Sequence, residues 1–179
     1  IIAGDYYVLF DAPNEYTFST NSITIIDDIL VIGSFPVVSL SLGENNLRQD
    51  IGLYIAGLIG DTVFYDTNED GIQNIGESGV SNVIVTLIRN DNIIESTTTD
   101  ENGFYQFEGV SVLSNIQPNT FYSYQVEFIP PSVPSGEAPY VFSPVGQDSQ
   151  VNRDTGRTNS FNLDNSNNSV QSMDAGIYR

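Results

Sequence analysis

Short apolar runs separated by turn residues constrain the fold of this 179-residue chain more than any other feature. No stretch keeps a helical period over several turns, and Gly, Asn, Asp and Pro bound segments of strand length. The expected strands are Tyr6–Phe10, Ser22–Ile26, Val37–Leu42, Gln49–Ile55, Leu58–Tyr65, Val83–Arg89, Ile93–Thr99, Gly103–Phe107, Tyr122–Ile129, Thr158–Leu163 and Ser172–Tyr178. This regular spacing predicts an all-β fold, an antiparallel β-sandwich.

The composition indicates a folded chain with little catalytic chemistry. Ten Tyr and ten Phe, with many Ile, Val and Thr, favour strands, whereas disordered acidic chains are poor in such residues. The chain contains no His, Cys, Lys or Trp. It therefore has no thiol nucleophile, no Ser-His-Asp triad, no His-ligated metal and no lysine Schiff base. We expect a protein that is not an enzyme.

The net charge limits the partners. Five basic residues, all of them Arg, against 23 acidic residues give a net charge of −18. This charge repels nucleic acid and anionic membrane surfaces, and no apolar run approaches the ~20 residues that span a bilayer. We therefore expect no nucleic-acid partner and no membrane insertion. A hard cation with oxygen ligands, such as Ca²⁺, is the natural counterpart of so many carboxylates.

An internal repeat indicates how the chain is organised. Tyr6–Phe10 and Tyr16–Phe18 recur as Tyr124–Phe128 and Tyr140–Phe142, and the closing motif Asp50–Tyr54 recurs as Asp174–Tyr178. We therefore predict that residues 58–179 form one complete unit and that residues 1–54 are the C-terminal half of a preceding unit. Residues 55–57 would be a short linker. The missing half of the first unit would come from unseen chain or from another molecule.

A twelve-residue segment carries the strongest chemical signal. Residues 66–77 read DTNEDGIQNIGE and fit the calcium-loop pattern D-x-[DN]-x-[DN]-G-x5-E at every constrained position. The predicted calcium ligands are Asp66, Asn68, Asp70, the backbone carbonyl of Ile72, Asn74 and Glu77. An ordinary acidic surface loop would not require Gly71 and Glu77 at the sixth and twelfth positions. The flanking residues predict a strand and a turn instead of two helices, so the ion would staple strands together.

Other carboxylates are weaker candidates for a second ion. Asp61, Asp100 and Asp148 could join such a site, and Glu101, Asp154 and Asp174 belong to the same set of acids that the fold could bring together. The alternative for each is a turn cap or a solvated charge. A glycosidase pair of carboxylates is not favoured, because the best-placed acids already belong to the loop.

The order of the motifs resembles the B repeats of Sdr-type bacterial surface adhesins, which are also called SdrD B-like or CnaB-like. The resemblance rests on residues 59–68, 76–80, 85–87, 98–107, 155–158 and 174–178. It implies a prealbumin-like or Ig-like β-sandwich of about seven strands, with calcium bound in each repeat by the loop residues named above. It also implies tandem repeats that hold an adhesive head away from the cell.

The sequence departs from the family pattern in two places. Relatives of the CnaB type often carry a Lys–Asn isopeptide bond, which a chain without Lys cannot form. The acidic cluster that reads Asp-Ser-Asp in the family is Asp148-Ser149-Gln150 here, so one carboxylate is missing from that place.

Three functions follow as hypotheses. The first is a non-catalytic spacer or stalk repeat, rigidified by calcium, in an extracellular protein of the bacterial cell surface or of a secreted filament. The second is a binding or adhesion module, and the third is a polymerising filament subunit that a neighbour completes by strand donation. The expected partners are neighbouring repeats of the same chain or neighbouring subunits, and a host or surface ligand would be bound through another domain.

Overall fold

All regular structure in the described part of the chain is β-strand, which confirms the predicted fold class. The computed structural model describes residues 2–13, 16–18, 23–26, 29–32, 37–46, 52–112, 122–164 and 168–179. These residues belong to two compact units, Ile1–Ala56 and Gly57–Arg179, referred to below as unit 1 and unit 2. None of the described segments is a helix with the length and apolarity that a membrane crossing requires.

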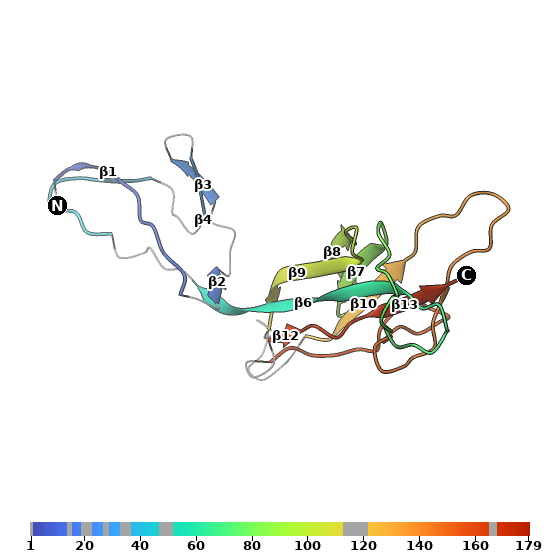
Figure 1. Ribbon diagram of the computed structural model, residues 1–179. Helices are drawn as coiled ribbons and strands as arrows, with labels where there is room; N and C mark the ends of the chain where they lie inside the picture. Colours follow the sequence, from blue (N-terminus) through green and yellow to red (C-terminus); the bar gives the residue numbers. More distant parts are fainter. Residues whose placement is uncertain are drawn as a thin grey trace. The chain divides into compact units, whose positions relative to one another are not determined.

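Unit 2 is a β-sandwich built from two sheets (Figure 1). The first sheet has the order β10-β7-β8, and its strands are β7 (Ile84–Arg89), β8 (Asn92–Thr98) and β10 (Tyr124–Ile129). The second sheet has the order β11-β13-β6-β12, and β9 also pairs with β6. Its strands are β6 (Leu53–Tyr65), β9 (Phe104–Ser111), β11 (Val141–Phe142), β12 (Ser169–Val170) and β13 (Ala175–Tyr178).

The core lies between the two sheets and follows from strand alternation. In β10, Tyr124, Val126 and Phe128 are buried while the two residues between them are only partly covered. Phe128 meets Tyr105 of β9 edge to face, with ring centroids 5.5 Å apart. Because β9 and β10 belong to different sheets, this contact joins the two layers. Burying one such ring contributes about 2–3 kcal/mol.

The strand directions differ from the antiparallel arrangement that the sequence predicts. β13 runs parallel to β6, with Ala175 opposite Val63 and Ile177 opposite Tyr65, and β12 also pairs with β6 in parallel. These strands come from opposite ends of unit 2, so the chain crosses to the other sheet between them and returns in the same direction. β6 also continues through residues 55–57, which the sequence predicts as a linker, so these residues keep strand geometry.

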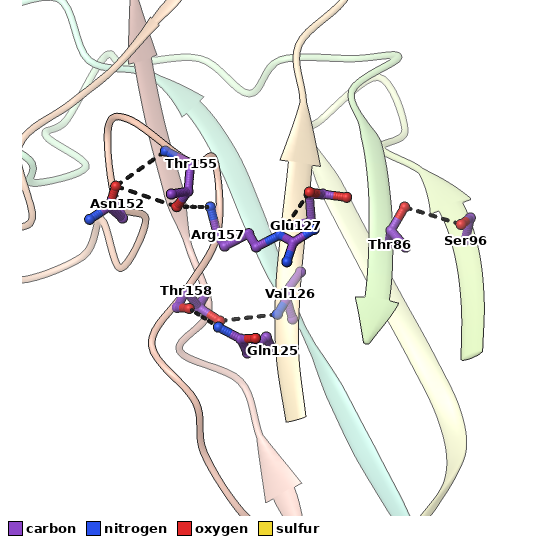
Figure 2. Close-up of polar contacts among 9 residues, drawn as sticks. All are labelled: Thr86, Ser96, Gln125, Val126, Glu127, Asn152, Thr155, Arg157 and Thr158. Atoms are coloured by element: carbon purple, nitrogen blue, oxygen red, sulfur yellow. Dashed lines mark hydrogen bonds and ion pairs between the residues drawn. The ribbon is translucent and has the colours of Figure 1, made fainter. Parts of the chain in front are cut away.

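A turn near residue 156 covers the free edge of β10 (Figure 2). The backbone N–H of Val126 donates to Thr158 Oγ1 at 3.0 Å, and Thr158 N–H donates back to the Val126 carbonyl at 2.9 Å. Arg157 Nε forms an ion pair with Glu127 Oε1 at 2.8 Å. The pair is partly exposed, so it contributes at most about 1 kcal/mol. The hydrogen bonds between Thr158 and the Val126 backbone therefore satisfy this sheet edge more than the ion pair does.

Unit 1 contains short strands. β1 (Gly4–Tyr6) pairs antiparallel with β5 (Val38–Leu40), and β3 (Ile23–Ile26) pairs antiparallel with β4 (Ile29–Ile32). β2 (Tyr16–Phe18) pairs with the first residues of β6. The strand predicted at Tyr6–Phe10 thus begins earlier and is shorter, and β4 is not anticipated by the sequence. Residues 49–51 of the predicted closing strand lie outside the described residues.

Candidate metal centre

The segment 66–77 forms a loop whose two ends are fixed to the sandwich. It begins at the end of β6, where Asp66 N–H donates to the Ile177 carbonyl of β13 at 3.0 Å. Just after the loop, Ser78 accepts the N–H of Tyr65 at 2.8 Å, and Val80 N–H donates to the Val63 carbonyl. The loop therefore returns to the strand from which it started.

The first predicted ligand, Asp66, organises the loop from a fully buried position. Its Oδ1 accepts the N–H of Asp70 at 3.1 Å, and its Oδ2 accepts the N–H of Gly71 at 2.8 Å. Asn68 Oδ1 also accepts the N–H of Asp70, and Asp70 Oδ1 accepts the N–H of Ile72 at 2.8 Å. The residues at loop positions 1, 3 and 5 thus wrap the backbone around their own side chains, as the calcium-loop spacing requires.

Glu77 closes the loop from its far end. Its Oε1 accepts both the N–H and the hydroxyl of Thr67, at 2.7 and 2.9 Å, and its Oε2 accepts the N–H of Asn74 at 2.9 Å. A single carboxylate therefore connects positions 2, 9 and 12. No three acidic side chains among the described residues gather closely enough to hold a metal by themselves. A cation here would need amide and carbonyl oxygens in addition to carboxylates, and Ca²⁺ accepts such mixed oxygen ligands.

Side-chain amides surround the carboxylate of Asp70. Asn68 Nδ2 lies 2.8 Å from Asp70 Oδ2, and Asn74 Nδ2 lies 3.1 Å from the same oxygen. Asn74 Nδ2 also lies 3.1 Å from the Ile72 carbonyl oxygen. The positive end of the Asn74 amide therefore stands between two of the oxygens that are predicted as ligands. A hard cation would use the same oxygens, so the donor chemistry of the loop fits calcium.

The environment of Asp70 favours its charged form. Partial desolvation raises the pKa of Asp70, but hydrogen bonds from the Ile72 N–H and from the amides of Asn68 and Asn74 outweigh it. The pKa of Asp70 therefore lies below its usual value. A carboxylate that stays ionised is available to a cation at any pH near neutrality.

Two of the three weaker candidates lie near one further acid. Asp61 and Asp174 share a hydrogen bond, and the charge of Asp148 acts on both. Thr62 N–H donates to Asp174 Oδ1 at 3.0 Å. The pKa of Asp174 is raised to about 7: burial is the largest cause, the charge of Asp61 adds to it, and the hydrogen bond from the Thr62 N–H opposes both. Burial also raises the pKa of Asp61.

Asp148 connects this acidic cluster to the loop 66–77. Its Oδ2 accepts the N–H of Gln73 at 2.7 Å, and its own N–H donates to the Gly71 carbonyl at 3.1 Å. Asp174 was not singled out among the acids by the sequence. The only sequence feature that points to Asp174 is its position directly before β13. It comes to lie beside Asp61 because β13 pairs in parallel with β6.

Asp100, the third weaker candidate, caps a turn. Its Oδ1 accepts the N–H groups of Asn102 at 2.8 Å and Phe104 at 2.9 Å. This is the alternative role that the sequence leaves open for an acid in such a turn. Its bonds here are to backbone groups of the turn that leads from β8 in one sheet to β9 in the other.

Comparison with known proteins decides the family. The model of the SdrD B-like domain matches residues 57–177. The chain belongs to this family. Serine-aspartate repeat-containing protein F of Staphylococcus epidermidis is 41% identical over 110 residues, which cover 60% of this chain and 7% of that protein. A fibrinogen-binding protein of the same species is 38% identical over 109 residues, 59% of this chain and 10% of that protein.

A third relative extends the similarity to unit 1. Serine-aspartate repeat-containing protein D of Staphylococcus aureus is 32% identical over 180 residues, which cover 98% of this chain and 12% of that protein. The chain thus spans a small part of each curated relative that it matches. The resemblance to Sdr B repeats is confirmed.

Proposed function

We propose that residues 57–179 are a calcium-binding spacer repeat of a protein on the bacterial cell surface. The observation that carries this proposal is the loop 66–77, which has the oxygen groups of a calcium loop and is hydrogen-bonded at its ends to β6 and β13. Membership of the SdrD B-like family supports it. The proposed role is non-catalytic and extracellular, and the partners are neighbouring domains of the same chain.

The ion would be held by groups of one loop. Asp66, Asp70 and Glu77 supply carboxylates, Asn68 and Asn74 supply amide oxygens, and Ile72 supplies its carbonyl. A bound cation neutralises carboxylates that otherwise repel one another. At an effective dielectric of ~20, two like charges at 4 Å cost on the order of 4 kcal/mol before relaxation. The ion would therefore hold the end of β6 and the start of the next segment in one arrangement.

The strand order of unit 2 suits a spacer. β6, the first strand, and β13, the last, lie side by side and run in the same direction. The chain therefore enters unit 2 near Leu58 and leaves beyond Tyr178, at the opposite end of this strand pair. Within unit 2, each strand residue adds about 3.3 Å to the distance between these two ends.

Calorimetric titration of the metal-free 179-residue chain with calcium chloride tests the proposal. We expect saturable binding, and Glu77→Gln should weaken it by at least about tenfold, because one carboxylate charge is lost from the ligand set. Glu101→Gln is the matched control, since it removes the same charge from an exposed turn outside the loop. Absence of binding, or equal weakening by both substitutions, would contradict the proposal.

A further inference from the structure

The two copies of the internal repeat share strand pairings as well as sequence motifs. In unit 2, β11 pairs with β13, with Val141 opposite Tyr178 and Phe142 opposite Ile177. In unit 1, β2 pairs with the start of β6, with Thr17 opposite Tyr54 and Phe18 opposite Leu53. These are the same positions of the repeated motifs, pair by pair. Unit 1 therefore assembles the same two strands in the same register as unit 2.

The closing strand of unit 2 has a second neighbour. On its other edge β13 pairs with residues 63–65 of β6, and β10 pairs along its length with β7. Both of these partners come from the N-terminal half of unit 2, residues 57–112. The repeat equivalent of that half does not occur within residues 1–54 of the sequence.

Exposed side chains in unit 1 occupy positions that are core positions in unit 2. Ile177 is 0% exposed, whereas Leu53 at the equivalent position is 40% exposed. Tyr124 is 0% exposed, whereas its equivalent Tyr6 is 36% exposed. In unit 2 the strands that carry these positions pair with strands of residues 57–112, and the Tyr124 hydroxyl donates to the Ser111 carbonyl of β9. Strands of the same kind would therefore adjoin these positions in unit 1.

We propose that unit 1 is a docking surface for the N-terminal half of an SdrD B-like repeat, supplied by chain that precedes residue 1. A strand equivalent to residues 63–65 lies parallel to Gly52 and Leu53, and a strand equivalent to β7 lies antiparallel to residues 6–10. The similarity to serine-aspartate repeat-containing protein D spans 98% of this chain and so includes unit 1 as well as unit 2. The proposal is independent of calcium binding.

A second copy of the chain is a poorer donor. Residues of its own N-terminal half, such as Ile59, Val63 and Leu87, are fully buried in the core of its unit 2. Donating these strands would open that core and expose all of its apolar surface. Strands that precede residue 1 and belong to no other core could pair with unit 1 without opening a folded unit.

The test is a fusion in which residues 57–118 of this chain are copied directly before Ile1. At the start of the repeat equivalent residues differ by 118 positions, since Tyr6 corresponds to Tyr124, so this junction keeps the repeat in register. Hydrogen exchange is followed by mass spectrometry in saturating calcium. We expect the amides of residues 6–10 and 52–55 to exchange at least about 100-fold more slowly in the fusion than in the 179-residue chain. The exchange of unit 2 should not change and serves as an internal reference.

Two identical substitutions at exposed leucines provide the matched comparison. Leu53→Glu places a charge at the equivalent of buried Ile177 and should abolish the slowing in the fusion. Leu9→Glu places Glu at the equivalent of Glu127 and should leave the slowing intact. The two leucines are similarly exposed, Leu9 at 53% and Leu53 at 40%, so exposure in the 179-residue chain does not separate the two variants. In the 179-residue chain neither substitution should change the exchange of unit 1.

Three results would overturn the proposal. One is unchanged exchange of unit 1 in this fusion and in a second fusion joined through a Gly-Ser linker, which removes any strain at the junction. Another is protection of residues 6–10 and 52–55 in the 179-residue chain equal to that of the unit 2 core. The last is protection in the 179-residue chain that increases with protein concentration, which would assign the surface to a second copy.

Discussion

At the scale of single residues, Gly71 joins the loop 66–77 to the rest of unit 2. Its φ of +74° lies in the left-handed region, and a Cβ built there would lie 2.5 Å from the Pro144 carbonyl oxygen and 3.1 Å from Gly146 Cα. Its own carbonyl accepts the N–H groups of Asp148 and Ser149. The position therefore requires glycine both for its backbone conformation and for the close approach of a second segment.

Gly71→Ala should destabilise unit 2 by about 3 kcal/mol or more, because the left-handed strain of about 1–2 kcal/mol adds to a clash with backbone atoms. Gly76→Ala is the control, since Gly76 has a φ of +99° but no atom within 4 Å of the built Cβ. That variant should cost only the strain. Urea unfolding of both variants measures the difference, and equal losses would show that Gly71 does not anchor the loop.

The buried acid Asp174 makes stability depend on pH. Its pKa is about 7 in the folded chain, against 3.8 for the ordinary group, so the folded state binds a proton more tightly than the unfolded state. Between about pH 4 and pH 7 the folded state holds this proton and the unfolded state does not. The free energy of unfolding should therefore fall as pH rises through this interval.

Thermal melting in chelator at several pH values measures this effect, and Asp174→Asn should remove most of it. The asparagine carries no titrating group and can still accept the N–H that Thr62 donates to this side chain. Asp154→Asn is the control, because it removes one carboxylate of an exposed turn and reports the general relief of the −18 charge. Parallel pH profiles for the three proteins would refute the assignment to Asp174.

At the scale of elements, the loop 66–77 connects the end of β6 with β13 and with the segment near Asp148. Without the proposed ion, the carboxylates of Asp66, Asp70 and Glu77 lie within one short loop with no cation to neutralise them. We expect chelator to lower the melting temperature and to speed protease cleavage between residues 66 and 79, because repulsion opens the loop. Gel and mass analysis of a protease time course give the cleavage sites.

The Glu101→Gln protein should respond to chelator as the unsubstituted chain does, whereas Glu77→Gln in calcium should already be cleaved faster. Identical cleavage in calcium and in chelator would mean that the loop is held by its own hydrogen bonds without an ion.

Sequence predicts local features of these elements better than distant pairings. The loop follows from a fixed spacing within twelve residues, and the alternation of β10 follows from Tyr124, Val126 and Phe128. The parallel pairing of β13 with β6 joins residues more than a hundred positions apart, and local propensity carries no information on it. The same pairing brings Asp174 beside Asp61, so the acidic cluster could not be assembled from the sequence.

At the scale of the whole molecule, the position of β6 and β13 decides how unit 2 responds to force. The two strands are the first and last of the unit, they are adjacent, and they run in the same direction. A load between residues 57 and 179 therefore pulls the strands in opposite directions along their length. The hydrogen bonds between them share this load, whereas a load across a hairpin would break its bonds one after another.

Single-molecule pulling of unit 2 within the 179-residue chain tests this response. Between residues 57 and 179, unfolding at constant force should be at least about tenfold slower in calcium than in chelator, since about 1.4 kcal/mol retained up to the transition state changes the rate by that factor. Attachment at residues 84 and 98, the two ends of the β7–β8 hairpin, should peel this hairpin at lower force. The calcium effect should be small there, because the loop 66–77 lies outside the hairpin. If both attachment geometries unfold at the same force and with the same calcium dependence, the parallel strand pair does not bear the load, and the spacer role loses its mechanical basis.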